Sequence, residues 1–153
     1  MSSAEAAKRR ILLKVQYDGT AFHGFQCQIG VRTVQEVLED GLFALTHERQ
    51  RIHASSRTDT GVHAAGLPVV LRTATNIPLV GFVRGLNQHL PDDLSIIDAA
   101  EVDDAFDVRK SSSGKDYRYR IWNGKGRSAV LRLTHWQVPF QLDLDAMRRA
   151  ADP

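Results

Sequence analysis

The densest run of reactive side chains in this sequence lies between Ser55 and Ala64 and reads SSRTDTGVHA. It places the carboxylate of Asp59 two positions after the guanidinium of Arg57. A neighbouring guanidinium favours the ionised form of a carboxylate. An ionised carboxylate in a loop can serve as a nucleophile or as a base. A plainer interpretation is an Asx-type turn in which Asp59 binds its own backbone. The run alone leaves both interpretations open.

Four other segments carry patterns that accompany the Asp59 run. They are YDGTAFHGFQCQ at 17–28, TVQEVLE at 33–39, LNQHLPDD at 86–93 and YRYRI at 117–121. Together with RTDTGVHA at 57–64, they resemble the signature motifs of the tRNA pseudouridine synthase A family, in the same order and at the same spacing. The resemblance covers nearly the whole chain, and five ordered matches are far more specific than any single one.

The resemblance implies an enzyme that isomerises uridine to pseudouridine in the anticodon stem-loop of tRNA, at positions 38 to 40, without cofactor or metal. In this reaction the glycosidic C–N bond breaks, the uracil turns, and C5 is joined to the sugar. The target nucleotide must first leave its stack. By this resemblance Asp59 is the catalytic aspartate. Attack on C6 of the base, attack on C1′ of the sugar and removal of a proton all stay open.

Two further residues belong to the expected catalytic set. Arg57 is expected to pair with Asp59 or to occupy the space that the flipped base vacates, with a phosphate contact or a surface pair as the alternative. Tyr117 corresponds to the family tyrosine that stacks on the target uracil, and an aromatic platform suits a flipped base. Its alternative role is ordinary packing on an alternating strand.

The remaining polar motif residues are expected to contact RNA or to support the loop. His63 is expected to anchor the loop rather than to act as a base, and Asp18 is expected to form a turn. The residues expected to bind RNA are Arg57, Phe22, Gln26, Gln28, Arg118 and Arg120.

The elements that must position these residues follow from hydrophobic periodicity. Apolar residues alternate in the strands and recur on one stripe in the helices. Thr33 and Glu36 have capping-box spacing, and Pro68 indicates an edge strand or a strand start. The expected elements are a strand at 11–17, a helix at 33–46, a short extended segment at 51–55, a strand at 66–73, a helix from Pro78 and a strand at 94–98.

This order predicts an α+β fold of the ferredoxin-like split βαβ type, with a mostly antiparallel sheet and helices on one face. Further strands are expected at 116–122 and 134–138, before a helix capped by Asp143. Residues 1–9 are expected to form a disordered tail. Residues 10–153 are expected to form the N-terminal catalytic half of a pseudouridine synthase whose C-terminal half is absent. We therefore expect this chain alone to bind RNA weakly and to turn over slowly or not at all.

The sequence departs from the family pattern at four places. Phe25 stands where the family usually has Trp, Ser56 replaces Gly, and Thr60 replaces Ala. Ser56 matters if its position needs a positive φ, which glycine alone adopts without strain. Leu67-Pro68 replaces Gln-Val and removes a backbone donor beside the catalytic loop.

Composition is that of an ordinary globular protein and says little about its partners. The chain has 153 residues, 42% of them hydrophobic, and no apolar run approaches the roughly 18 residues of a membrane span. Cys27 is the only cysteine, which favours a reducing, cytoplasmic setting. The net charge is only +2, but residues 105–135 hold eight Lys or Arg against two Asp. Such a segment is able to contact phosphates, although a solvated, charged strand pair is the simpler interpretation.

Three other functions compete with the enzyme. The first is an RNA-binding module, or a truncated fragment, without catalytic activity. The second is a metal-dependent hydrolase, which is disfavoured because the six histidines form no H-x-x-x-H or H-E-x-x-H pair on an expected helix. The third is a structural or small-molecule-binding domain of the same fold. The expected partners are therefore tRNA and, in the full-length protein, a second copy in a homodimer, with no membrane and no metal.

Overall fold

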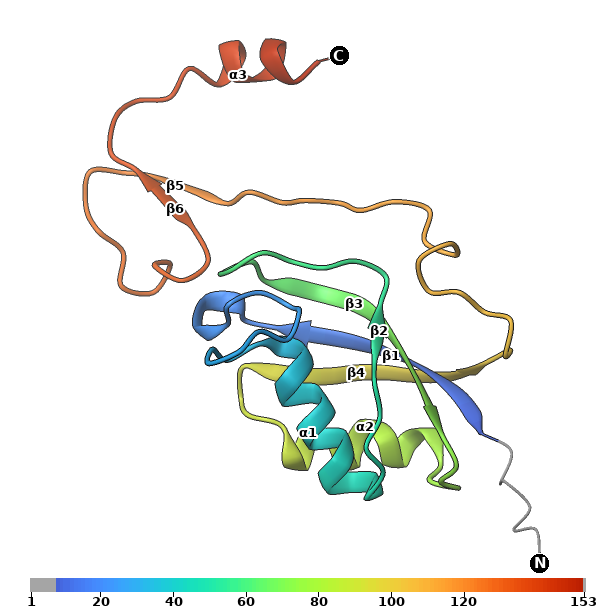
Figure 1. The fold of residues 1–153 in the computed structure, drawn as a ribbon. Helices are drawn as coiled ribbons and strands as arrows, with labels where there is room; N and C mark the ends of the chain where they lie inside the picture. Colours follow the sequence, from blue (N-terminus) through green and yellow to red (C-terminus); the bar gives the residue numbers. More distant parts are fainter. Residues whose placement is uncertain (1–7, 153) are drawn as a thin grey trace, which may run out of the picture. The chain divides into compact units, whose positions relative to one another are not determined.

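The computed structural model describes residues 8–152, and the chain divides into two compact units between Ser113 and Gly114 (Figure 1). The tail expected at residues 1–9 lies outside the described residues as far as residue 7. The expected C-terminal boundary of the tail at residue 9 is wrong, because Arg9 already belongs to the first strand.

The first unit has the element order strand, helix, two strands, helix, strand. Its elements are β1 (Arg9–Tyr17), the 3₁₀ turn η1 (Gly19–Ala21), α1 (Val34–Thr46), β2 (His53–Ala54), β3 (Ala64–Thr73), α2 (Leu79–His89) and β4 (Leu94–Val102). The four strands form one sheet in the order β2-β3-β1-β4, and every neighbouring pair is antiparallel. A mixed fold with an antiparallel sheet is thereby confirmed.

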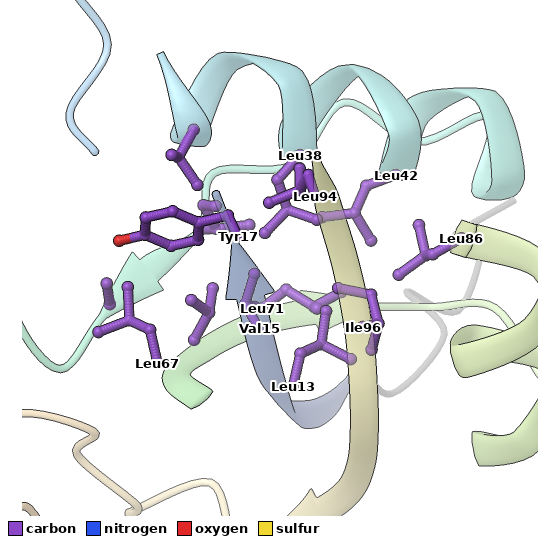
Figure 2. Packing of buried hydrophobic residues seen from close by; sticks show 14 of the residues in the cluster. Leu13, Val15, Tyr17, Leu38, Leu42, Leu67, Leu71, Leu86, Leu94 and Ile96 are labelled. Atoms are coloured by element: carbon purple, nitrogen blue, oxygen red, sulfur yellow. The ribbon is translucent and has the colours of Figure 1, made fainter. Parts of the chain in front are cut away.

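Alternation along β1 gives the sheet one apolar face. Every second side chain from Ile11 to Tyr17 is buried, because successive side chains of a strand point to opposite faces. This face receives the apolar stripes of α1 and α2, each buried side chain contributing about 1.5–3 kcal/mol. Figure 2 shows the packing of Leu13, Val15, Leu71 and Ile96 from the sheet with Leu38 and Leu42 from α1 and Leu86 from α2.

The helices begin within one residue of the positions that the local sequence predicts. The hydroxyl of Thr33 accepts a hydrogen bond from the backbone N–H of Glu36 at 3.4 Å and so caps α1. His47 ends α1 in the left-handed conformation, with φ of 58°. Pro78 is the N-cap of α2 rather than its first residue. Asn87 ties α2 to β4, because its side chain exchanges two hydrogen bonds with the backbone of Ile96, at 2.7 and 2.8 Å.

Pro68 does not mark an edge strand, because β3 lies between β2 and β1. The carbonyl of Pro68 accepts a hydrogen bond from the N–H of Ser55 at 2.9 Å, just beyond the end of β2. The nitrogen and carbonyl of one residue in an antiparallel strand face the same neighbour. The nitrogen of Pro68, which carries no hydrogen, therefore faces the end of the two-residue strand β2. Its lack of a donor costs no hydrogen bond to β1.

The second unit contains the strands β5 (Ile121–Asn123) and β6 (Trp136–Val138), which pair in parallel, and the helix α3 (Leu144–Ala151). Asp143 caps α3 as expected and accepts hydrogen bonds from Asp145 N and Ala146 N. The strand expected at 116–122 is wrong before Ile121, since residues 114–120 form no ladder with any described segment. The strand expected from residue 134 begins at Trp136.

Candidate active site

Asp59 begins a tight turn in the loop that joins β2 to β3. The carbonyl of Asp59 accepts a hydrogen bond from the N–H of Val62 at 3.2 Å, which closes the turn. Gly61, at the third position, has φ of 79° and there adopts a conformation that favours glycine. The N–H of Gly61 also donates to the carbonyl of Phe22 at 3.2 Å. The backbone that carries Asp59 is thus held by one hydrogen bond within its own turn and by another to the segment that follows β1.

The segment after β1 packs its backbone directly against this turn. A Cβ atom on Gly19 would lie 2.1 Å from the carbonyl oxygen of Val62, and one on Gly24 would lie 2.8 Å from that of Thr58. The N–H of Phe25 donates to the carbonyl of Thr58 at 3.0 Å. Glycine at 19 and 24 is therefore what allows residues 18–25 and 58–62 to come together.

Tyr17 holds the same loop through its side chain. Its hydroxyl lies 2.7 Å from Oγ1 of Thr58, and its ring packs edge-on against Phe22 with 6.2 Å between centroids. Burial raises the pKa of the Tyr17 hydroxyl, although the bond to Thr58 lowers it in part. The hydroxyl therefore stays neutral at ordinary pH and serves as a hydrogen-bonding group at the end of β1.

Asp18 and His63 connect the segment that follows β1 to the loop that carries Asp59. Asp18 caps η1 by accepting hydrogen bonds from the hydroxyl and the N–H of Thr20, and these bonds, with a smaller contribution from His63, lower the pKa of Asp18. Nδ1 of His63 lies 3.1 Å from Oδ1 of Asp18 and accepts a hydrogen bond from the N–H of Gly19 at 3.2 Å. Asp18 as turn former and His63 as loop anchor agree with the sequence analysis.

The carboxylate of Asp59 is exposed, and it makes no hydrogen bond or ion pair with any residue between 8 and 152. The expected ion pair with Arg57 is not formed, because both side chains extend into solvent from a backbone fixed at Thr58. An exposed pair would add little stability. The Asx-type turn is also not formed, since the Asp59 carboxylate binds no backbone N–H of a described residue. The acid is left available for chemistry.

Phe22 is not placed to bind RNA, which corrects its expected role. The ring is only 1% exposed and lies between Tyr17 and the guanidinium of Arg32, which sits 4.0 Å above the ring centroid. Arg32 in turn makes two hydrogen bonds to the carboxylate of Asp93, at 2.7 and 2.8 Å. Sequence reasoning missed Arg32. The signal that could have indicated Arg32 was Asp93 in the LNQHLPDD motif, because a carboxylate that holds a loop in place often binds an arginine in two hydrogen bonds.

The other expected RNA contacts differ in their support. Gln26 and Gln28 are exposed beside the candidate site, and Gln28 donates a hydrogen bond to the carbonyl of His23 at 2.8 Å. Tyr117, Arg118 and Arg120 belong to the second unit and are exposed in its irregular segment. The expected strand alternation of these three residues is therefore absent, and their roles stay predictions.

Comparison with known proteins identifies the family. A family model described as tRNA pseudouridine synthase matches residues 14–109, which include both loops around Asp59. The chain belongs to this family. It is 43% identical over 142 residues to tRNA pseudouridine synthase A of Myxococcus xanthus, covering 93% of this chain and 54% of the relative. The protein of the same name from Pelobacter propionicus is 44% identical over 143 residues, covering 94% of this chain and 59% of the relative. The chain thus spans a little over half the length of these relatives.

The departures from the family pattern do not strain the site of this tRNA pseudouridine synthase family member. Among the described residues other than glycine, only His47 has a positive φ, so Ser56 occupies its position without backbone strain. Phe25 is 3% exposed and keeps an aromatic ring in the core. Thr60 is exposed at the turn, where a hydroxyl meets solvent.

The TVQEVLE motif at the start of α1 holds the loops of the site through hydrogen bonds. Gln35 on α1 accepts a hydrogen bond from the N–H of Cys27 at 3.1 Å and donates one to Glu39 at 2.8 Å. Glu39 then accepts the N–H of Ile52 at 3.2 Å, just before β2. This chain of bonds fixes the loop around Cys27 and the approach to the Asp59 loop on the same helix.

No three His, Cys, Asp or Glu side chains among residues 8–152 gather in a way that would hold a metal ion. No helix in that range is long and apolar enough to cross a membrane. The expectation that the reaction needs neither cofactor nor metal stays a prediction.

Proposed function

We propose that the protein to which this chain belongs isomerises uridine to pseudouridine in tRNA, with Asp59 as the catalytic carboxylate. One observation carries the proposal. The Asp59 side chain is exposed and unpaired among the described residues, on a loop whose backbone is bound by the segment that follows β1. Membership of the tRNA pseudouridine synthase family supports the choice of reaction.

The reaction suits a single free carboxylate. The bond between C1′ and N1 breaks, a bond between C1′ and C5 forms, the proton on C5 leaves, and N1 gains a proton, so atoms and electrons balance without a co-reactant. An ionised Asp59 serves as a nucleophile, toward C6 or C1′, or as the base that removes a proton. Because the backbone of Asp59 is already held in place, its loop needs little rearrangement for the carboxylate to reach the flipped nucleotide.

The finer assignments complete this proposal. The substrate segment is the anticodon stem-loop of tRNA, at positions 38 to 40. Tyr117 stacks on the flipped uracil, and Arg57 fills the space that the base vacates. Gln26, Gln28, Arg118 and Arg120 bind the RNA around it, and their exposure is consistent with this role.

The architecture is that of a ferredoxin-like unit in one half of a larger, homodimeric, cytoplasmic enzyme. The order of elements from β1 to β4, together with the sheet order β2-β3-β1-β4, supports the ferredoxin-like type. The match to a little over half of each relative supports the assignment of residues 10–153 to the N-terminal catalytic half. Because the chain spans a little over half the length of these relatives, we expect slow turnover by the isolated chain.

Release of tritium from tRNA labelled at C5 of uridine tests the proposal under single-turnover conditions, with protein in excess. The 153-residue chain is compared with its Asp59→Asn and Asp59→Ala variants, and RNA affinity is measured in parallel. We expect slow release by the wild-type chain and none by either variant, with affinity retained. Asp92→Asn is a matched control, because Asp92 is exposed and binds no described side chain.

Two outcomes contradict the proposal. Release that persists in Asp59→Asn removes the catalytic role of this residue. Binding by the wild-type chain and both variants, with no release from any of them on prolonged incubation, favours an RNA-binding module.

A further inference from the structure

A concave surface, the basic pocket, lies at the opposite end of β1 from Asp59. It has a volume of about 530 Å³. Glu48 is its only carboxylate among the described residues. Its lining includes five cationic side chains and one histidine, which are Lys8, Arg10, Arg49, Arg51, Arg72 and His53. No residue of this pocket belongs to the motifs that surround Asp59.

The sheet itself brings two of these cations together. Arg10 on β1 and Arg72 on β3 are directly opposite each other in the antiparallel register. Like charges in this position destabilise a sheet unless an anion lies between them. The carbonyl of Asp104 accepts hydrogen bonds from Nη1 of Arg10 at 2.6 Å and from Nη2 of Arg72 at 3.4 Å. The carboxylate of Asp104 also forms an ion pair with Arg72 at 3.2 Å, but its side chain is 72% exposed. Such an exposed pair compensates the repulsion only weakly.

Some groups of the pocket have partners within the fold, and others have none among the described residues. The carboxylate of Glu48 already accepts hydrogen bonds from the hydroxyl of Thr73 and the N–H of Ala74. Nε of Arg10 is buried and has no hydrogen-bond partner among the described residues. Lys8 and Arg51 are exposed and make no hydrogen bond or ion pair with any residue between 8 and 152. The pocket therefore offers an excess of positive charge and free donors.

We propose that the basic pocket binds backbone phosphates of the substrate RNA, away from the nucleotide that reacts. The inference rests on the proposed function, which makes RNA the polyanion that this chain meets. Arg10 and Arg72 supply fixed charge on the sheet, while Lys8 and Arg51 reach the phosphates from the rim. Arginine and lysine contacts of this kind position a nucleic acid without reading its sequence.

The position of the pocket sets the length of RNA that it reaches. β1 runs from Arg10 at the pocket to Tyr17, whose hydroxyl binds the residue before Asp59. Seven residues of strand span about 23 Å. An RNA with its target uridine at Asp59 must therefore extend by a comparable distance before a phosphate enters the pocket. The basic pocket acts as a second point of contact that selects long stems.

The test measures RNA affinity of the 153-residue chain and of matched single-charge variants. Arg51→Gln removes a pocket cation, whereas Arg84→Gln removes a cation from α2 that is also exposed but lies outside the pocket. The ligands are a whole tRNA and hairpins that share its anticodon loop, with stems lengthened by one base pair at a time. Kd is measured over a range of salt concentrations, and thermal melting checks that both variants fold.

We expect Arg51→Gln to raise Kd for the whole tRNA about three- to tenfold at low salt and to reduce the slope of log Kd against log salt by about one. The shortest hairpin should lose no affinity, and adding Lys8→Gln should weaken whole-tRNA binding further. Arg84→Gln should stay within about twofold of the wild-type chain, since it neutralises no phosphate contact.

Three results overturn the inference. Equal effects of Arg51→Gln and Arg84→Gln on tRNA, with the wild-type chain binding normally, remove the pocket but leave the proposed function standing. Failure of the wild-type chain to bind any of the RNAs removes both. Unchanged RNA affinity in Arg51→Gln, together with loss of binding to vesicles of phosphatidylserine and phosphatidylcholine, assigns the pocket to an anionic membrane surface instead.

Discussion

The hydroxyl of Tyr17 lies 2.7 Å from Oγ1 of Thr58, the residue that precedes Asp59. Tyr17 is the last residue of β1 and is almost fully buried, so this bond connects the core of the sheet to the candidate catalytic loop. The carboxylate itself makes no hydrogen bond or ion pair with another described side chain. Its position is therefore determined by the backbone of its loop and by the residues that hold that loop.

Replacing Tyr17 with Phe keeps the ring and removes the hydroxyl. We expect the free energy of unfolding to fall by about 0.5–1.5 kcal/mol, because Thr58 loses a partner in a partly buried position. Tritium release should fall more than RNA affinity does, since the loop that carries Asp59 loosens. Urea denaturation and the single-turnover assay measure the two effects. Tyr119→Phe is the control, because Tyr119 is 85% exposed; equal losses in both variants would contradict the prediction.

Replacing Gly19 with Ala places a methyl group where the carbonyl of Val62 already lies, 2.1 Å from the new Cβ. The two loops must separate, so we expect a loss of about 1–3 kcal/mol in the free energy of unfolding and no measurable turnover. Gly126→Ala should change stability little, because no atom lies within 4 Å of its Cβ position. Chemical denaturation of both variants checks this, and a Gly19→Ala chain as stable as Gly126→Ala would show that the loops are not in close contact.

Removing the carboxylate of Asp18 should change the response of the protein to acid. The pKa of Asp18 is held below its ordinary value of 3.8, chiefly by the hydroxyl and N–H of Thr20. A carboxyl with a lowered folded-state pKa stabilises the fold above its unfolded value and loses that contribution as pH falls through the folded value. Because Asp18 is partly exposed, the contribution is small.

We therefore expect Asp18→Asn to lower stability near neutral pH and to flatten its decline below about pH 4. Thr20→Val, which removes the hydroxyl donor and keeps the shape of the side chain, should act in the same direction. Urea denaturation at a series of pH values measures both. A decline in Asp18→Asn as steep as that of the wild-type chain would mean that other carboxyls cause it.

Replacing Arg32 with Lys keeps the charge but removes the planar group that binds Asp93 twice and covers Phe22. Lysine does not reproduce two-pronged binding or stacking. We expect a loss of about 1–3 kcal/mol in the free energy of unfolding. Arg148→Lys in α3 is a matched control, since its ion pair with Asp145 is exposed and should contribute little. Similar melting temperatures for the two variants would argue against a supporting role for Arg32.

Local features of the chain predicted most of the first unit. The alternation from Ile11 to Tyr17 and the cap at Thr33 depend on residues that are close in sequence, and both are present as expected. The strand expected at 116–122 is wrong over most of its length, because its formation depends on a partner that is distant in the sequence. Alternation shows that a segment suits a strand, but a strand also needs a partner along its backbone. Residues 115–119 belong to no ladder among the described residues.

The sequence by itself determined the family motifs, the acid at 59 and the elements on which they lie. Tertiary structure alone decided what surrounds that acid. The register that pairs Tyr17 with Ala64 puts the last residue of β1 beside the first residue of β3, so the loops that follow β1 and precede β3 meet. This contact buries Phe22, links Arg32 to Asp93 and leaves Arg57 and Asp59 apart in solvent. Such relationships join residues that are distant in the chain, and they depend on strand pairing that no local pattern encodes.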